Sequence, residues 1–229
     1  MAAFTAKLLE LSLQPPFGLA GRITCPGHVR LSPGQYFLAN RPGGLDLLPT
    51  TLFPADWEEG ILETAPPLPD AWPVGAELAL RGPLGKGFHL PAQARRVALA
   101  ALETPFQRLL PLATIALAQQ ADVVFYTDTP AGSLPRSVEA LPLSALPESL
   151  AWADYLALDT PLHQVDHLRD RLSMEPGKRY ACQMELLLAM DFPCGGVADC
   201  GVCAVKTRRG WKLACNDGPV FELSDFDIL

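Results

Sequence analysis

The chain has 229 residues, of which 49% are hydrophobic, and a formal net charge of −7. This length allows one large or two small domains with a sizeable core, and the acidic balance without a basic stripe excludes nucleic-acid binding. The first residues lack the basic start and apolar core of a signal peptide, and the longest apolar run, residues 109–118, is too short to span a membrane. We therefore expect a cytoplasmic protein, in which clustered cysteines favour metal binding over disulfides.

Residues 4 to about 90 contain short apolar segments separated by Pro- and Gly-containing turns. Strands at this spacing are typical of an antiparallel β-barrel or a sandwich. The expected strands cover residues 4–13, 19–25, 35–39, 50–53, 60–64 and 77–81. We predict an N-terminal β-barrel domain over residues 1–92.

From about residue 95, predicted strands alternate with predicted helices, which is the pattern of a parallel sheet covered by helices. A helix is expected over residues 105–120, where proline occupies the first turn, and another over 162–174, where apolar residues recur at helical spacing. The expected strands cover residues 96–102, 122–128, 137–143, 155–159 and 179–184. This predicts an α/β, Rossmann-like domain over residues 93–184, followed by a short helical turn over 185–190.

Four of the six cysteines gather near the C-terminus. Cys194, Cys200 and Cys203 follow a C-x5-C-x2-C spacing on a Gly-rich loop, and Cys215 comes after a predicted hairpin over residues 204–214. Thiolates are soft ligands that suit an iron–sulfur cluster or Zn²⁺, and three clustered cysteines plus a distant one approach the plant-type spacing of [2Fe–2S] proteins. We predict a metal-binding segment over residues 185–229 that these four cysteines define.

Other interpretations of the cysteines stay open at this point. A structural zinc site normally shows two C-x2-C pairs or Cys/His pairs, whereas one such pair is present here without a nearby histidine. A disulfide framework suits small secreted chains. Cys25 and Cys182 are predicted to be buried apolar side chains, because free cysteine packs as a small hydrophobe. The zinc alternative would make the chain a structural or regulatory subunit of a larger assembly.

Three further stretches complete the pattern: residues 31–37 (LSPGQYF), 80–88 (LRGPLGKGF) and 185–221, which ends in C-x-D-G-P-V-F. With the order of barrel, α/β domain and cysteine segment, they resemble the electron-transfer subunit of NAD-dependent dihydroorotate dehydrogenase, in the ferredoxin reductase-like superfamily. The family motifs are a P-G-Q-F strand, a G-P-L-G-x-G-F barrel exit and the cysteine ending. The resemblance implies a [2Fe–2S] cluster with Cys194, Cys200, Cys203 and Cys215 as ligands, although the first spacing is one residue longer than in the family.

The nucleotide-binding stretches depart from the family pattern. Where the family holds FAD with Arg-x-Phe/Tyr-Ser, residues 48–52 contain no arginine, and Thr51 is the residue that could take the small-hydroxyl role toward FAD. The family's phosphate loop is replaced by residues 65–69, whose prolines cannot donate an N–H. The turn expected to hold the nicotinamide cofactor's pyrophosphate, residues 100–105, has no glycine and carries Glu103. Residues 159–161 stand in place of the family's Cys-Gly-Pro turn.

The resemblance therefore predicts an oxidoreductase component that relays single electrons through a [2Fe–2S] cluster and has no catalytic residue of its own. NAD(P)H binding is expected to be lost, and FAD is left open as a second cofactor. The implied partner is a flavoprotein catalytic subunit such as a dihydroorotate dehydrogenase-like chain of pyrimidine biosynthesis, in a hetero-oligomer. No nucleic-acid partner and no membrane span are expected.

Overall fold

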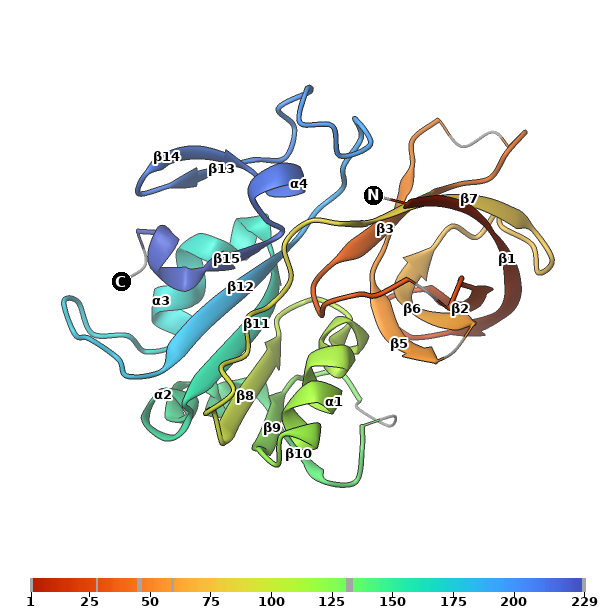
Figure 1. The fold of residues 1–229 in the computed structure, drawn as a ribbon. Helices are drawn as coiled ribbons and strands as arrows, with labels where there is room; N and C mark the ends of the chain where they lie inside the picture. The colour runs from red at the N-terminus through yellow and green to blue at the C-terminus, as the bar shows by residue number, and fades with distance from the viewer. Residues whose placement is uncertain (1, 28, 45–46, 59, 131–133, 228–229) are drawn as a thin grey trace.

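The computed structural model describes residues 2–27, 29–44, 47–58, 60–130 and 134–227. An N-terminal β-barrel lies beside a mixed sheet with helices on its faces, and an extended segment links the two (Figure 1). The last parallel strand runs toward the barrel and continues into the cysteine-rich loop beside it, and the small hairpin that follows lies on the side away from the barrel (Figure 1). Among the described residues, none of the helices has the length and hydrophobicity of a membrane span.

In the described part of the chain, seven antiparallel strands form the barrel in the order β4-β3-β7-β1-β2-β6-β5. The strands at the two ends of this order, β4 and β5, are separated by Phe53 alone, and the Ala65 N–H of β6 donates to the Phe53 carbonyl at 2.8 Å, so the sheet almost closes on itself. The predicted barrel is thereby confirmed. The strands are β1 (Ala2–Leu13), β2 (Leu19–Thr24), β3 (Tyr36–Asn40), β4 (Thr50–Leu52), β5 (Pro54–Glu58), β6 (Ile61–Leu68) and β7 (Glu77–Leu84).

Strand β5 was missing from the sequence prediction, because Pro54 and Asp56 make this stretch resemble a loop. Proline is tolerated at the first residue of a strand, where its missing N–H breaks no ladder, and Pro54 occupies that position in β5. The barrel core behind these strands is strongly apolar. Its largest fully buried members are Trp72, Phe37, Leu8 and Ile23.

Within the described residues, six strands form the second sheet in the order β10-β9-β8-β11-β12-β15. All are parallel except β15, which runs antiparallel to β12. The strand order reverses between β8 and β11, and such a reversal opens a crevice at the carboxyl ends of the strands where α/β proteins bind ligands. The strands are β8 (Arg96–Ala101), β9 (Asp122–Tyr126), β10 (Val138–Leu141), β11 (Tyr155–Pro161), β12 (Gln183–Ala189) and β15 (Val220–Glu222). The predicted α/β architecture is confirmed.

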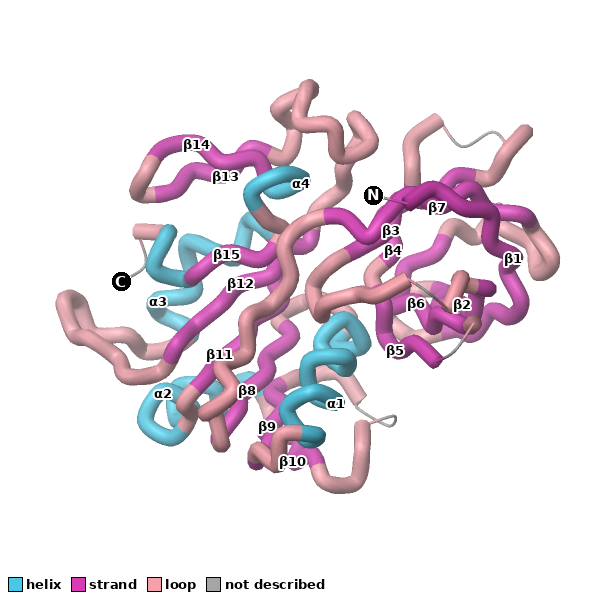
Figure 2. Tube along the Cα trace, in the orientation of Figure 1, coloured by secondary structure: helices cyan, strands magenta, loops and turns pink. Residues whose placement is uncertain are grey.

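The helices around this sheet are short (Figure 2). The helix expected over residues 105–120 is a 3₁₀ turn, η1, followed by α1, and proline stands in the first turn of α1, where its missing N–H is tolerated. The helix expected over 162–174 is likewise divided into η3 and α3. The elements are η1 (Phe106–Leu109), α1 (Leu110–Ala118), η2 (Leu143–Glu148), α2 (Ser149–Trp152), η3 (Leu162–His167), α3 (Leu168–Arg171) and η4 (Leu223–Asp225).

The prediction of a helical turn over residues 185–190 is wrong. Residues 185–189 belong to β12, which pairs with β11 on one side and β15 on the other. Three successive leucines in this strand are fully buried, as the interior of a parallel sheet requires. A short continuous apolar run does not distinguish a buried strand from a buried helix, and here sheet pairing decides the outcome.

One buried carboxylate connects this sheet to the segment that leaves the barrel. Glu185 on β12 is 3% exposed, and it accepts a hydrogen bond from the His89 N–H at 2.8 Å and another from the Tyr155 hydroxyl of β11. Hydrogen bonds to a charged acceptor are stronger than those between neutral groups. Glu185 therefore fixes the linking segment against the centre of the sheet.

We expect Glu185→Ala to lower the free energy of unfolding by about 2–4 kcal/mol, because it leaves the buried Tyr155 hydroxyl and the His89 N–H without their acceptor. Chemical denaturation measures this change. The matched control is Glu139→Ala on β10, whose side chain is exposed and whose loss should change stability by less than about 0.5 kcal/mol. Equal stability of the two variants would contradict the connecting role of Glu185.

Candidate metal centre

The hairpin after the cysteine loop brings two of the predicted ligands together. Strands β13 (Ala204–Thr207) and β14 (Gly210–Leu213) pair antiparallel and lead into α4 (Ala214–Asp217). At the base of the hairpin the Ala214 N–H donates to the Cys203 carbonyl at 2.9 Å, and the Cys215 N–H points at Cys203 Sγ at 3.5 Å. Both thiols are buried, and burial is the main cause that raises the pKa of Cys215 to about 12.

The other two predicted ligands form a second pair at the surface of the same loop. Cys194 is half-buried and Cys200 is exposed. The backbone N–H of Asp199, followed by those of Cys200 and Val197, donates to the Cys194 thiol and lowers its pKa to about 6, against a smaller opposing effect of burial. The Cys200 side chain also hydrogen-bonds to it. The loop thus directs its backbone donors inward at sulfur.

The two pairs face a common centre against the barrel. Cys194 and Cys203 both act electrostatically on Cys215, and all three act on Tyr36 at the start of β3. The loop passes over this ring with positive φ at Gly196, where an added Cβ would lie 3.3 Å from Tyr36 Oη. Glycine is needed at this position, because both the backbone conformation and the close approach disfavour a side chain.

The donor set of four thiols suits an iron–sulfur cluster. The thiols lie as two hydrogen-bonded pairs, Cys194 with Cys200 and Cys203 with Cys215. A [2Fe–2S] cluster takes four thiolates over two irons, and such paired thiols match that arrangement.

Thr51 lies on a cavity of about 520 Å³ between the barrel, η1 and the residues that precede Cys194. Its Oγ1 is buried and has no hydrogen-bond partner among the described residues. Residues 48–52 contain no cation, but Arg108 of η1 lines the same cavity. Its guanidinium lies 4.9 Å from the Phe53 ring centroid. The sequence could have indicated Arg108 as a binding residue, because it follows a strand-to-helix turn and such turns lie at the carboxyl edge of the sheet.

Two carboxylates, Asp159 and Glu103, lie near the point between β8 and β11 where the strand order reverses. Asp159 of β11 is fully buried, and Arg108 Nη1 lies 3.7 Å from its Oδ1. Burial raises the pKa of Asp159 to about 6, although Arg108 opposes the effect. Glu103 follows β8 and accepts a hydrogen bond from Gln164 of η3 at 2.7 Å. It also lies 3.3 Å from a ring nitrogen of His163, so its contacts bridge the elements that follow β8 and β11.

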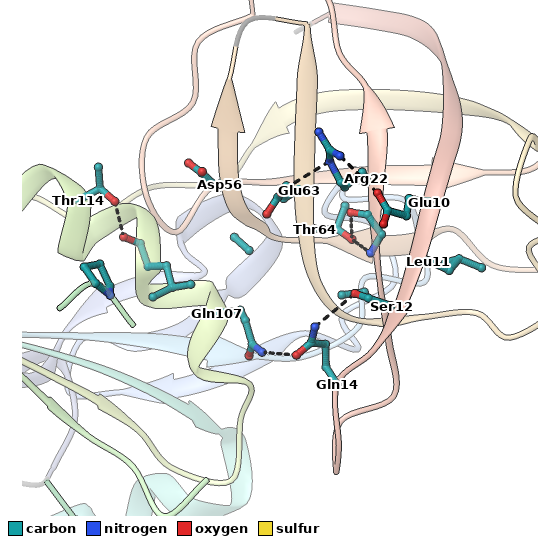
Figure 3. A pocket seen from close by; sticks show the side chains of 15 residues that line it. Glu10, Leu11, Ser12, Gln14, Arg22, Asp56, Glu63, Thr64, Gln107 and Thr114 are labelled. Carbon is teal, nitrogen blue, oxygen red and sulfur yellow. Dashed lines mark hydrogen bonds and ion pairs between the residues drawn. The ribbon is translucent and has the colours of Figure 1, made fainter. Parts of the chain in front are cut away.

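A separate cavity of about 530 Å³ lies between the barrel and the start of α1 (Figure 3). Arg22 bridges Glu10 at 3.3 Å and Glu63 at 3.4 Å, and Gln107 donates to Gln14 at 3.3 Å. Figure 3 shows these side chains paired with one another along the wall. Because these charges already have partners, the cavity gives no second candidate site.

The remaining cysteines lie apart from this centre. Cys182 is buried, as predicted, and burial raises its pKa to about 12. Cys25, just after β2, is only half-buried, so it is less enclosed than the expected core position. Neither sulfur is among the groups that shift the pKa of Cys194 or Cys215.

Solved structures of several reductases and oxidoreductases share this fold. A reduced ferredoxin-NADP oxidoreductase that depends on NADH matches with a TM-score of 0.77 at 17% identity, over 96% of this chain and 89% of that chain. A cytochrome P450 reductase from Amycolatopsis matches with a TM-score of 0.60 at 18% identity, over 82% of this chain and 70% of that chain. Phthalate dioxygenase reductase matches with a TM-score of 0.52 at 13% identity, over 97% of this chain and 77% of that chain. At these identities the likeness establishes the fold, which is that of ferredoxin reductase-like proteins.

The cysteine segment gives the more specific comparison. Residues 194–227 match the family model of the iron-sulfur cluster binding domain of dihydroorotate dehydrogenase B. No curated protein matches this chain significantly. The match confirms the predicted resemblance to the electron-transfer subunit of that enzyme and supports the predicted iron–sulfur cluster.

The buried Asp159 carboxyl should make stability depend on pH. Its pKa rises from 3.8 in the unfolded chain to about 6 in the folded protein, so the native state holds the proton longer and stability falls as pH rises through this window. We expect the wild type to lose about 1 kcal/mol relative to Asp159→Asn between pH 5 and pH 8, measured by denaturant unfolding. Asp122→Asn, at an exposed position on β9, is the control. A pH-independent difference between wild type and Asp159→Asn would contradict the raised pKa.

Proposed function

We propose that this chain is an electron-transfer subunit that relays single electrons through a [2Fe–2S] cluster and no longer binds NAD(P)H. The proposed ligands are Cys194, Cys200, Cys203 and Cys215. The observation that carries the proposal is the placement of these four thiols as two contacting pairs under a loop whose backbone donors point at sulfur. When bound, such a cluster exchanges one electron at a time at the potential that its surroundings set.

The loop's own residues support both binding and electron exchange. Backbone N–H groups directed at Cys194 stabilise thiolate charge, while the enclosed Cys203 and Cys215 keep water from one side of the centre. On the other side Cys200 is exposed. An electron donor or acceptor protein can therefore approach this side of the loop closely.

The α/β sheet retains the strand order of a nucleotide-binding domain, but its crevice opposes a bound pyrophosphate. A glycine-rich turn normally lets a phosphate reach the N-terminus of a helix at this edge. Here Glu103 places a carboxylate after β8 and is held by Gln164 and His163 of η3. A nicotinamide dinucleotide would have to displace these contacts and overcome repulsion between like charges.

FAD stays open as a second cofactor. The stretches that the resemblance assigns to FAD, residues 48–52 and 65–69, contribute Thr51 and Pro67 to the cavity that Arg108 also lines. Arg108 Nε and Nη1 have no hydrogen-bond partners among the described residues, and a guanidinium binds phosphate oxygens in a two-pronged geometry. The proposal for FAD therefore depends on this one cation, and flavin extraction from the purified protein decides it.

The partner that we propose is a flavoprotein catalytic subunit of the dihydroorotate dehydrogenase kind, in a hetero-oligomer. Support comes from the family model that the cysteine segment matches. The cysteine loop and its hairpin also expose three large apolar side chains, Val197, Val202 and Trp211. Apolar side chains gathered around a redox centre suit a protein interface. Trp211 is 72% exposed, so it is available to a partner and does not shield the thiols.

We expect the anaerobically purified protein to be red-brown, to contain two irons and two sulfides per chain, and to give an electron paramagnetic resonance signal after reduction. Cys203→Ser and Cys215→Ser should each lose most of the iron, because they remove enclosed ligands. Cys25→Ser and Cys182→Ser are the matched controls and should retain it. A colourless protein with one zinc per chain would favour the structural alternative instead.

A second prediction concerns the electron donor. NADH or NADPH alone should leave the visible spectrum of the oxidised protein unchanged, because the crevice that would bind the dinucleotide carries Glu103. Dithionite should reduce the same sample completely, which serves as the positive control. Rapid reduction by NADH without an added reductase would show that the nicotinamide site persists.

A further inference from the structure

The Tyr36 hydroxyl lies at the base of the cysteine loop without an assigned role. Tyr36 begins β3, and its side chain is 0% exposed. Its Oη has no hydrogen-bond partner among the described residues. A buried hydroxyl without a partner lowers stability, and such groups in folded proteins generally meet a water, an ion or a cofactor. The groups that surround this hydroxyl are therefore the candidates for its hydrogen-bond partner.

Tyr36 Oη faces the cysteine loop. A Cβ at Gly196 would lie 3.3 Å from this oxygen, so the hydroxyl faces the loop that connects Cys194 to Cys200. Cys215, Cys203 and Cys194 are all close enough to act electrostatically on Tyr36. A phenol is protonated at neutral pH, so its O–H is a hydrogen-bond donor that faces the cysteine loop.

The ring of Tyr36 is held on two sides by other aromatic rings. Phe192, two residues before Cys194, stacks on it with centroids 4.6 Å apart at 21°. Phe53, between β4 and β5, lies 5.7 Å from it at 47°. Because these contacts fix the ring, the hydroxyl is oriented before any cofactor binds, and little further ordering is needed.

We propose that the Tyr36 hydroxyl donates a hydrogen bond to a sulfur atom of the [2Fe–2S] centre and thereby raises its reduction potential; this inference rests on the proposed function. Reduction adds one electron from an external donor, with no bond made or broken and no proton transferred. The added negative charge strengthens the hydrogen bond, so the hydroxyl stabilises the reduced form more than the oxidised form.

Packing alone does not explain a tyrosine at this position. The contacts with Phe192 and Phe53 involve the ring, and phenylalanine would make them without a buried hydroxyl. A sulfur acceptor accounts for the buried hydroxyl.

The test is a redox titration of the cluster-containing protein, followed by visible absorption and electron paramagnetic resonance. Tyr36→Phe should retain wild-type iron and sulfide. At the wild-type midpoint, its ratio of reduced to oxidised centres should be about tenfold lower, which corresponds to about 59 mV for one electron. Tyr126→Phe is the matched control, because it removes a buried tyrosine's hydroxyl from β9 in the other sheet and should leave the midpoint unchanged.

The outcomes separate this inference from the proposed function. A wild-type protein without iron and sulfide would refute the proposed function itself. A fully loaded Tyr36→Phe protein with an unchanged midpoint would overturn the hydrogen bond and leave the proposed function intact. A midpoint that shifts equally in Tyr126→Phe would also overturn it, because the effect would then not depend on position.

A second measurement decides the matter if Tyr36→Phe fails to fold or to retain its cluster. Replacing all tyrosines by 3-fluorotyrosine keeps every ring in place and makes each hydroxyl a stronger donor. The midpoint should then rise in the wild type, opposite to the shift expected for Tyr36→Phe. An unchanged or lowered midpoint in the fluorinated, fully loaded protein would refute the proposed donor.

Discussion

The candidate centre depends on one packing constraint: the cysteine loop must fit between a barrel strand and a small hairpin. Tyr36 of β3 forms the base, and Gly196 allows the loop to pass over its ring. On the other side the hydrogen bond from Ala214 to the Cys203 carbonyl holds Cys215 beside Cys203. The barrel and the C-terminal segment, far apart in the sequence, thus build one site for sulfur ligands, which is buried at Cys203 and Cys215 and open at Cys200.

The α/β sheet supports the cysteine segment independently of any nucleotide. Its strand order buries the apolar faces of β8, β11 and β12, which stabilises the fold whether or not a nucleotide binds. Phosphate recognition depends instead on a few loop residues at the edge of such a sheet. The cysteine segment is anchored away from these loops, because it adds β15 to the sheet beside β12.

Much of this arrangement could be predicted from the sequence. Alternating and continuous apolar segments located the barrel and most parallel strands, and cysteine spacing identified the four candidate ligands before any geometry was known. The last parallel strand was predicted over residues 179–184, whereas β12 covers Gln183–Ala189. It was placed too early because three leucines fit a buried helix and a buried strand equally well. The placement of Arg108 at the cavity beside Thr51, and of the Tyr36 hydroxyl beside the cysteine loop, depends on contacts between distant segments, which local patterns do not encode.

The most direct test of the central claim is anomalous scattering at the iron edge from anaerobically grown crystals. The structure predicts two iron peaks between the paired sulfurs, one beside Cys194 and Cys200 and the other beside Cys203 and Cys215. A single metal peak at the centre of all four sulfurs, absent at the iron edge and present at the zinc edge, would contradict it.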